Sequence, residues 1–181
     1  MSLNQSTIYI RQETPSDFYQ TREVIRKAFL NVKESDQTEH LLVEKLRKLP
    51  DFNPELSLVA QTATGKIIGH VLLTEVKLVS NQEETLLALA PLSVLPIWQR
   101  LGVGSALVRE AHRKAIRLGY KGIVILGSPG YYGRFGYKKA TEFGISMPFP
   151  GYEDYCLAIE LTPNALHRME GKIVYPTVFF E

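Results

Sequence analysis

A turn at residues 99–104, with the sequence Gln-Arg-Leu-Gly-Val-Gly, joins a strongly apolar segment to an amphipathic one. Gly102 and Gly104 have no Cβ atom, so they leave room for a ligand to approach the backbone. The first N–H groups of a helix that begins here lack intrahelical partners and lie at the positive end of the helix dipole. This combination predicts a site for an anion, in particular for a phosphate group.

Two well-known phosphate-binding patterns do not fit this turn. A Walker loop ends in Gly-Lys-Ser or Gly-Lys-Thr, whereas Gly104 is followed by Ser105 and Ala106. A dinucleotide-binding fingerprint has a third glycine three residues after the second, and Leu107 stands at that position. A tight strand-to-helix turn without a ligand is the alternative, and the turn by itself does not decide between the two.

The segments on either side position the turn. Residues 85–95 are almost continuously apolar, which is typical of a strand buried on both faces, and Pro91 predicts a bulge or a splayed edge there. After the turn, apolar residues recur every three or four positions, which predicts a helix that ends at Gly119. These apolar residues are Val103, Leu107, Ala111, Ala115 and Leu118.

The rest of the chain also mixes strand and helix patterns. Helices are expected from Pro15 to about residue 28 and around residues 41–49. Further strands are expected at 7–11, 56–63, 66–79, 122–126, 154–161 and 172–175, with turns at Gly65 and 81–84 and loops at 127–130 and 147–151. This order predicts an α/β (α+β) fold with a mixed, partly parallel central sheet flanked by helices.

Composition limits the class of protein. A chain of 181 residues, 45% of them hydrophobic, fits one compact domain over residues 1–181. The formal net charge is +2 and the basic residues are spread along the chain, so neither nucleic acid nor a membrane is an expected partner. The single cysteine, Cys156, excludes an intramolecular disulfide framework. No apolar run approaches a membrane span and the N-terminus lacks a leader pattern, so a cytoplasmic protein is expected.

Two motifs together resemble a known family. The spacing Gln99-x-x-Gly102-x-Gly104 after an apolar strand resembles the acetyl-coenzyme A signature of the GCN5-related N-acetyltransferase (GNAT) family. Further along, Tyr132, Gly136 and Tyr137 match the Tyr-x-x-x-Gly-aromatic pattern of a later cofactor-contacting segment of that family. The order of these motifs is similar to that of its bacterial YhbS-like branch, and the resemblance extends from about residue 8 to residue 176.

The resemblance implies an N-acetyltransferase that moves an acetyl group from acetyl-CoA, its co-substrate, to a primary amine by direct attack on the thioester. It also implies a splay at the fourth strand, beside which the pantetheine arm pairs with the strand backbone. The amides of residues 101–105 would surround the pyrophosphate. The cofactor-binding residues implied are Leu92, Ser93, Val94, Gln99, Arg100, Leu101, Gly102, Val103, Gly104, Ser105 and Tyr132.

The reaction needs two proton transfers. A lysine-like amine of pKa about 10.4 must lose a proton near pH 7, which costs about 4 to 5 kcal/mol unless the site helps. The leaving thiolate gains from a nearby O–H donor. By the resemblance this donor is Tyr132, with Tyr131 as the second candidate. The alternative is that Tyr132 is a packed structural anchor.

The general base is less clearly marked. Many family members carry a carboxylate on the fourth strand, whereas residues 86–94 contain none. Glu39 or His40 on the second expected helix, or Glu75, could serve instead, although each also fits a surface or structural role. His70 lies in an apolar strand and is interpreted as a satisfied core histidine.

No metal is expected, because His112 and His167 lack the neighbours of a metal site. Many relatives have an asparagine within residues 127–130, where this chain has Ser128 as the available polar substitute.

The motifs do not identify the acceptor of the acetyl group. The resemblance assigns acceptor specificity to the first two helices, the loop between them and residues 149–152. The aromatics of residues 149–152 could line a pocket for a small amine, an aminoacyl group or a protein N-terminus, or could cap the core. A homodimer is expected through the apolar strand at residues 173–175 and the terminal Phe179 and Phe180, with a monomer as the alternative. A protein that binds acetyl-CoA but is catalytically weak or inactive, with a regulatory role, is the alternative function.

Overall fold

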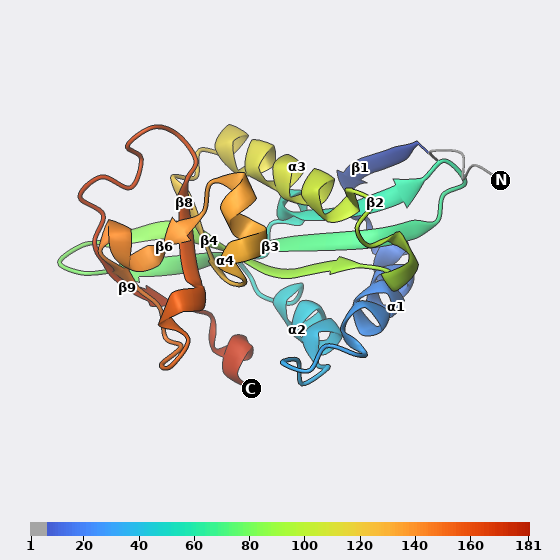
Figure 1. Ribbon diagram of the computed structural model, residues 1–181, viewed down its shortest axis with the longest axis horizontal. Coiled ribbons are helices and arrows are strands. Elements are labelled where there is room, and N and C mark those ends of the chain that lie inside the picture. Colours follow the sequence, from blue (N-terminus) through green and yellow to red (C-terminus); the bar gives the residue numbers. More distant parts are fainter. Residues whose placement is uncertain (1–6) are drawn as a thin grey trace. The chain divides into compact units, whose positions relative to one another are not determined.

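The computed structural model describes residues 7–181 (Figure 1). Residues 1–6 lie outside the described residues. They are part of the N-terminal segment for which no leader was predicted. The helices are α1 (Phe18–Phe29), α2 (Glu39–Leu46), α3 (Val103–Arg117) and α4 (Pro129–Tyr132). The strands are β1 (Ile8–Gln12), β2 (Ser57–Thr62), β3 (Ile67–Val79), β4 (Glu83–Val94), β5 (Gly122–Leu126), β6 (Lys138–Lys139), β7 (Ile145–Ser146), β8 (Cys156–Glu160) and β9 (Gly171–Val174).

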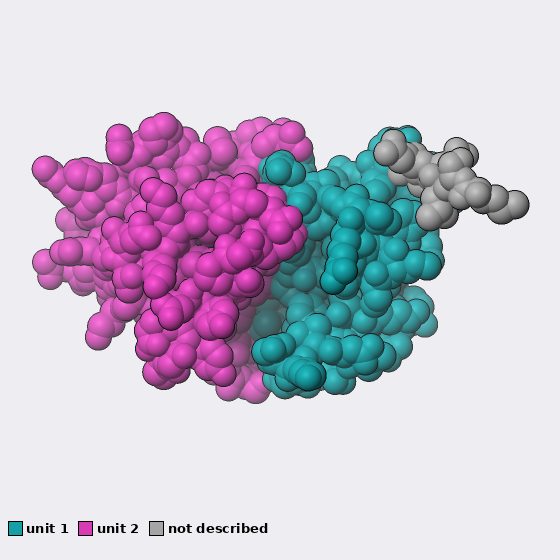
Figure 2. Space-filling view, in the orientation of Figure 1, with its two compact units in different colours: residues 1–73, 91–111 teal, residues 74–90, 112–181 magenta. Residues whose placement is uncertain are grey.

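The chain forms two compact units (Figure 2). The first contains the described residues up to Leu73 together with Pro91–Ala111, and the second contains Thr74–Ala90 and His112–Glu181. β3, β4 and α3 therefore contribute residues to both units.

In the first unit, β1 pairs antiparallel with β2, and β2 pairs antiparallel with β3. Just after β4, the Leu95 amide donates to the Ile68 carbonyl on β3 at 2.9 Å. α1 and α2 lie against one another (Figure 1). A core cluster joins Val24 of α1 to Val59 and Ile67 of the strands. Thr14 caps the start of the helical region in a capping box with Asp17.

In the second unit, β4 and β5 pair in parallel, Leu87 with Ile123 and Ala88 with Val124. β5 pairs antiparallel with β8, and β8 pairs antiparallel with β6. The ladder between β5 and β8 engages all five residues of β5, whereas the ladder with β4 stops at Ala88, before Pro91. The parallel pair needs a crossover connection, which α3 provides. These pairings confirm the mixed α/β fold with a partly parallel sheet.

Some expected elements differ in extent. β4 begins at Glu83, inside the expected turn at residues 81–84, because the hairpin closes through the Ser80 amide and the Gln82 carbonyl at 3.0 Å. The two-residue strands β6 and β7 were not expected, since two residues are too few to show an alternating pattern. The expected strand at 154–161 is shorter because residues 153–155 form a 3₁₀ turn.

The C-terminal aromatic residues pack within the second unit. The rings of Phe149 and Tyr175 lie 5.3 Å apart, and those of Tyr175 and Phe179 lie 4.9 Å apart. Of the two roles expected for this loop, Phe149 therefore takes that of a cap on the core, while Tyr152 is exposed. β9, the strand expected to dock, already pairs antiparallel with β3 over Lys172–Val174 and in parallel with β7 over Gly171 and Lys172. Among residues 7–181, no helix is long and apolar enough to cross a membrane.

Candidate active site

The glycine turn lies in the first unit, between β4 and α3. A short 3₁₀ turn, Pro96–Trp98, follows β4, and the Gln99 side-chain amide returns to donate to the Val94 carbonyl at 3.0 Å. This bond ties the mouth of the turn to the end of β4. The structure thus brings together residues 92–94 and 99–105, which the sequence assigned to one cofactor site.

Gly102 is required by the backbone conformation. Its φ is +86°, in the left-handed region that side chains disfavour, and a Cβ atom added there would meet nothing within 4 Å. Arg100 also has a positive φ of +60°, which is uncommon for a residue with a side chain. The space beside Gly102 is open, as an approaching ligand requires.

The amides that follow form the start of α3. The Ala106 amide donates to the Gly102 carbonyl at 3.0 Å. The preceding amides of Val103, Gly104 and Ser105 belong to the first turn of α3. In the first turn of a helix, no helix carbonyl is placed to accept from an amide. α3 has 15 residues, long enough for its dipole to add positive potential at this end. The turn has the features of an anion-binding helix N-terminus.

The end of β4 alternates between outward and inward side chains. Leu92 and Val94 are half-buried, whereas Pro91 and Ser93 are buried. The Ser93 hydroxyl has no hydrogen-bond partner among the described residues. A ligand beside this strand would contact Ser93 through its backbone and Leu92 or Val94 through their side chains.

Tyr132 lies in the second unit, at the end of α4. Its amide donates to the Ser128 carbonyl at 2.9 Å, and its ring lies 4.9 Å from that of Tyr131 and 5.7 Å from that of Tyr137. A Cβ atom on Gly127 would lie 2.6 Å from the Tyr132 ring, so this glycine makes room for the ring. Burial raises the pKa of the Tyr132 hydroxyl well above its usual range, and the neighbouring Tyr131 adds to the effect.

Two neighbours of Tyr132 have partners of their own. His112 forms a hydrogen bond of 3.0 Å with the hydroxyl of Tyr137. The Arg134 guanidinium lies 4.6 Å from the centre of the Tyr131 ring, within cation–π range. Tyr131 thus contacts a cation as well as the Tyr132 ring. Burial also raises the pKa of Tyr137 well above its usual range.

The candidate bases have partners within their own units. The Ser35 hydroxyl donates to the Glu39 carboxylate in the first turn of α2. The Tyr120 hydroxyl donates to the Glu75 carboxylate, in a second-unit cleft that Lys121 also lines. His40 is half-buried, and its Nδ1 has no hydrogen-bond partner in the described part of the chain. Among residues 7–181, no group of three or more His, Cys, Asp or Glu side chains could hold a metal ion.

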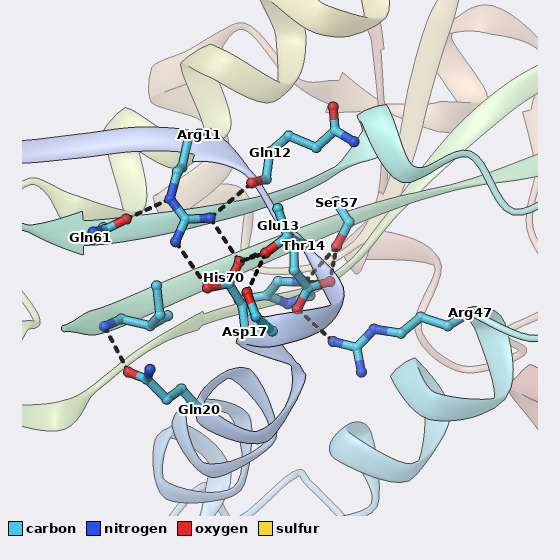
Figure 3. Close-up of polar contacts among 12 residues, drawn as sticks. Arg11, Gln12, Glu13, Thr14, Asp17, Gln20, Arg47, Ser57, Gln61 and His70 are labelled. Atoms are coloured by element: carbon cyan, nitrogen blue, oxygen red, sulfur yellow. Dashed lines mark hydrogen bonds and ion pairs between the residues drawn. The ribbon is translucent and has the colours of Figure 1, made fainter. Parts of the chain in front are cut away.

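A buried polar network in the first unit was not foreseen from the sequence (Figure 3). The Glu13 carboxylate accepts from Arg47 Nη2 at 2.6 Å and from the Ser57 hydroxyl at 2.7 Å. The Ser57 hydroxyl also bonds His70 Nε2 at 2.9 Å. The Arg47 guanidinium lies 3.9 Å from the centre of the Phe18 ring. Glu13 and Arg47 are 34 positions apart and carry no local pattern that could have linked them.

His70 is neutral in this network. Burial lowers its pKa to about 4; Glu13 opposes the shift and Arg47 adds to it. The expectation of a core histidine holds for its place, since the residue is wholly buried. The expectation that it is satisfied holds for one ring nitrogen only. Nε2 is bonded to Ser57, while Nδ1 has no partner within residues 7–181.

The comparisons with known proteins define the class. The sequence model of the Acetyltransferase (GNAT) family matches residues 18–137, a span that includes the glycine turn and Tyr132. The chain belongs to the GNAT family and is an acyltransferase, as its motifs predicted.

Individual relatives place the chain more closely. The uncharacterized N-acetyltransferase YhbS of Escherichia coli K12 is 32% identical over 166 residues, which are 92% of this chain and 95% of YhbS. The uncharacterized N-acetyltransferase YjhQ of the same organism is 33% identical over 157 residues, covering 86% of this chain and 82% of YjhQ. The predicted YhbS-like branch is confirmed.

Two solved structures have the same fold. The E. coli YhbS structure in complex with CoA matches with a TM-score of 0.87 and 29% identity, covering 100% of this chain and 96% of that chain. A GNAT family acetyltransferase from Brucella melitensis in complex with acetyl-CoA matches with a TM-score of 0.79 and 32% identity, covering 97% and 99%.

Proposed function

We propose that this protein binds acetyl-CoA at the glycine turn and transfers its acetyl group to a primary amine. The observation that carries the proposal is the turn itself: Gly102 at a φ of +86° with open space beside it, directly before the first turn of α3. Support comes from the two similar structures, whose proteins were solved with CoA and with acetyl-CoA. The acceptor is a small amine or a protein N-terminus.

In this proposal the cofactor lies along two backbone segments. The amides of residues 101–105 hold the pyrophosphate, with Gln99 and Arg100 at the mouth of the turn. The pantetheine arm pairs with the β4 backbone at Leu92, Ser93 and Val94. Pro91 supports this arrangement, because it has no N–H for a strand ladder and so favours an open edge.

The reaction is a direct transfer. The neutral amine attacks the thioester carbonyl, a C–N bond forms, and the C–S bond breaks. The amine proton passes to a base, for which Glu39 is the candidate, and the CoA thiolate takes a proton from the Tyr132 hydroxyl. The raised pKa keeps that hydroxyl protonated over the neutral range, so it can donate a hydrogen bond to the developing thiolate, while the same shift makes complete transfer of its proton less favourable.

Two measurements test the proposal together. Calorimetry with acetyl-CoA measures binding, and a thiol-release assay over a library of small amines and N-terminal peptides measures transfer. Binding with turnover of at least one amine supports the proposal, and absence of binding refutes it. Binding without turnover across the library favours the regulatory alternative. The hydrogen bonds that the Glu39 and Glu75 carboxylates already accept are consistent with that alternative.

A homodimer is the second part of the proposal. Val174 of β9 and Phe180 near the C-terminus are both more than half exposed and could be covered by a second copy. Light scattering coupled to size-exclusion chromatography measures the mass. A mass of one chain at micromolar concentration would contradict the dimer.

A further inference from the structure

β3 passes close to the start of α3 at Gly69. A Cβ atom added to Gly69 would lie 2.9 Å from Leu107 Cδ1 and 3.2 Å from Val103 Cγ1, both on α3. It would also lie 3.1 Å from the Ser93 carbonyl oxygen on β4. All these residues belong to the first unit.

Space, and not backbone conformation, requires a glycine at this position. Gly69 is absent from the described glycines with a positive φ, so alanine could adopt its backbone angles. The neighbours cannot easily move away. Val103 and Leu107 are fully buried, in an interior where a displaced methyl group finds no free volume. The Ser93 oxygen is part of the backbone, and the nearby bond between Leu95 and Ile68 holds β4 to β3.

The crowded atoms belong to the proposed cofactor site. Val103 is the first residue of α3, and its amide is one of those assigned to the pyrophosphate. Ser93 lies in the β4 segment assigned to the pantetheine arm. We infer that Gly69, which contacts no ligand itself, is a positioning residue of the acetyl-CoA site: its missing side chain sets how closely α3 and β4 approach β3.

This inference rests on the proposed function, and the experiment separates the two. Gly69→Ala is compared with Gly122→Ala, a strand glycine of the second unit. A Cβ atom on Gly122 would lie 2.8 Å from Leu166 Cδ2 and 2.9 Å from the Ile159 carbonyl oxygen, so the crowding is similar. None of these atoms belongs to the glycine turn or to α3. Calorimetry measures the Kd for CoA of each folded variant, and denaturant unfolding measures its stability.

We expect Gly69→Ala to weaken CoA binding about tenfold or more, and Gly122→Ala to change it by less than about twofold at a comparable loss of stability. Gly69→Ala with CoA affinity within about twofold of the wild type, or equal losses in both variants, overturns the inference. If the wild type itself does not bind CoA, the proposed function fails. The inference is then judged by amide hydrogen exchange of residues 99–107, which Gly69→Ala should accelerate and Gly122→Ala should not.

A second variant covers the case in which Gly69→Ala does not fold. Adding Leu107→Ala removes the atom that the new methyl group meets first, at 2.9 Å. The double variant should fold and bind CoA as well as the Leu107→Ala single variant does. A double variant that folds and binds at least tenfold more weakly than Leu107→Ala, while the amide hydrogen exchange of residues 99–107 is unchanged, would show that Gly69 does not act through the position of α3 and β4, which contradicts the inference.

Discussion

At the scale of single residues, the environment of Tyr132 decides whether it can act as an acid. The side chain packs among other aromatic rings, and burial raises the pKa of its hydroxyl. The hydroxyl therefore stays protonated across the neutral range. A donor role and an anchoring role both fit this packing, and kinetics distinguish them.

Tyr132→Phe keeps the ring and removes the hydroxyl. If Tyr132 protonates the leaving thiolate, kcat should fall by about 10²-fold or more while the Kd for acetyl-CoA changes little. Tyr131→Phe is the comparison: it removes the hydroxyl of the second candidate and keeps the ring that contacts Arg134, so its kcat should change little if Tyr132 is the acid. Steady-state thiol release and calorimetry give the two quantities. Unchanged kcat with a good amine would remove the acid role from Tyr132.

Gly102 and Gly119 form a matched pair at the two ends of α3. Both have a φ of +86°, and a Cβ atom on either would meet nothing within 4 Å. An alanine at either site should therefore cost a similar free energy of unfolding, about 1–2 kcal/mol. Only Gly102→Ala should also weaken CoA binding, because only this glycine lies in the turn. Equal CoA affinity in the two variants would argue against the turn as the pyrophosphate site.

At the scale of elements, the buried network fastens α2 to the strands. Arg47 follows the last residue of α2, Glu13 follows β1, and Ser57 begins β2. Because neither charge of the pair is exposed to water, each depends on the other for its solvation. The ion pair thus adds a buried link between the end of α2, which the family resemblance assigns to the acceptor side, and the strands, beside the packing of Val43 and Leu46.

Arg47→Met should lower the free energy of unfolding by about 3–5 kcal/mol, because it leaves the Glu13 carboxylate buried without its cation. Adding Glu13→Gln should recover part of this loss. The control is Arg22→Met, since the Arg22–Glu44 pair is exposed and should contribute about 1 kcal/mol or less. Urea unfolding compares the three variants with the wild type. A loss at Arg47 no larger than that at Arg22 would show that the network does not hold α2.

At the scale of the whole molecule, the stability of the fold should depend on pH through His70. Its pKa is about 4 in the folded protein and about 6.5 when unfolded, so the unfolded state binds the proton first. Stability is complete above pH 6.5 and falls as the pH drops towards 4, by up to about 3 kcal/mol. Asp17, whose pKa the Arg11 hydrogen bond lowers, contributes a further loss below about pH 4.

The variant His70→Gln tests this dependence, because glutamine cannot take up a proton in this range. The slope of unfolding free energy against pH between 6.5 and 4 should become flatter than in the wild type. Urea titrations at several pH values measure it. An unchanged slope would mean that His70 does not control stability in this window.

The sequence predicted features that depend on neighbouring residues and missed those that depend on residues far apart in the chain. The turn at residues 99–104, the helix after it and the hairpin of β2 and β3 were foreseen, since each shows a pattern within a few residues. The link between Glu13 and Arg47 was missed, because it spans 34 positions and arises only when the strands and α2 pack. Gly69 was missed for a related reason: within a strand, its importance depends on Leu107 of a distant helix.

The short turn before Gln99 has a practical consequence. It contains Trp98, the one tryptophan of the sequence, half-buried next to the proposed pyrophosphate site. Light at the red edge of the indole absorption band hardly excites the nine tyrosines, so the fluorescence comes from this single tryptophan. The protein therefore carries its own optical probe of the turn. Stopped-flow mixing with CoA can follow occupation of the site without a label or an acceptor.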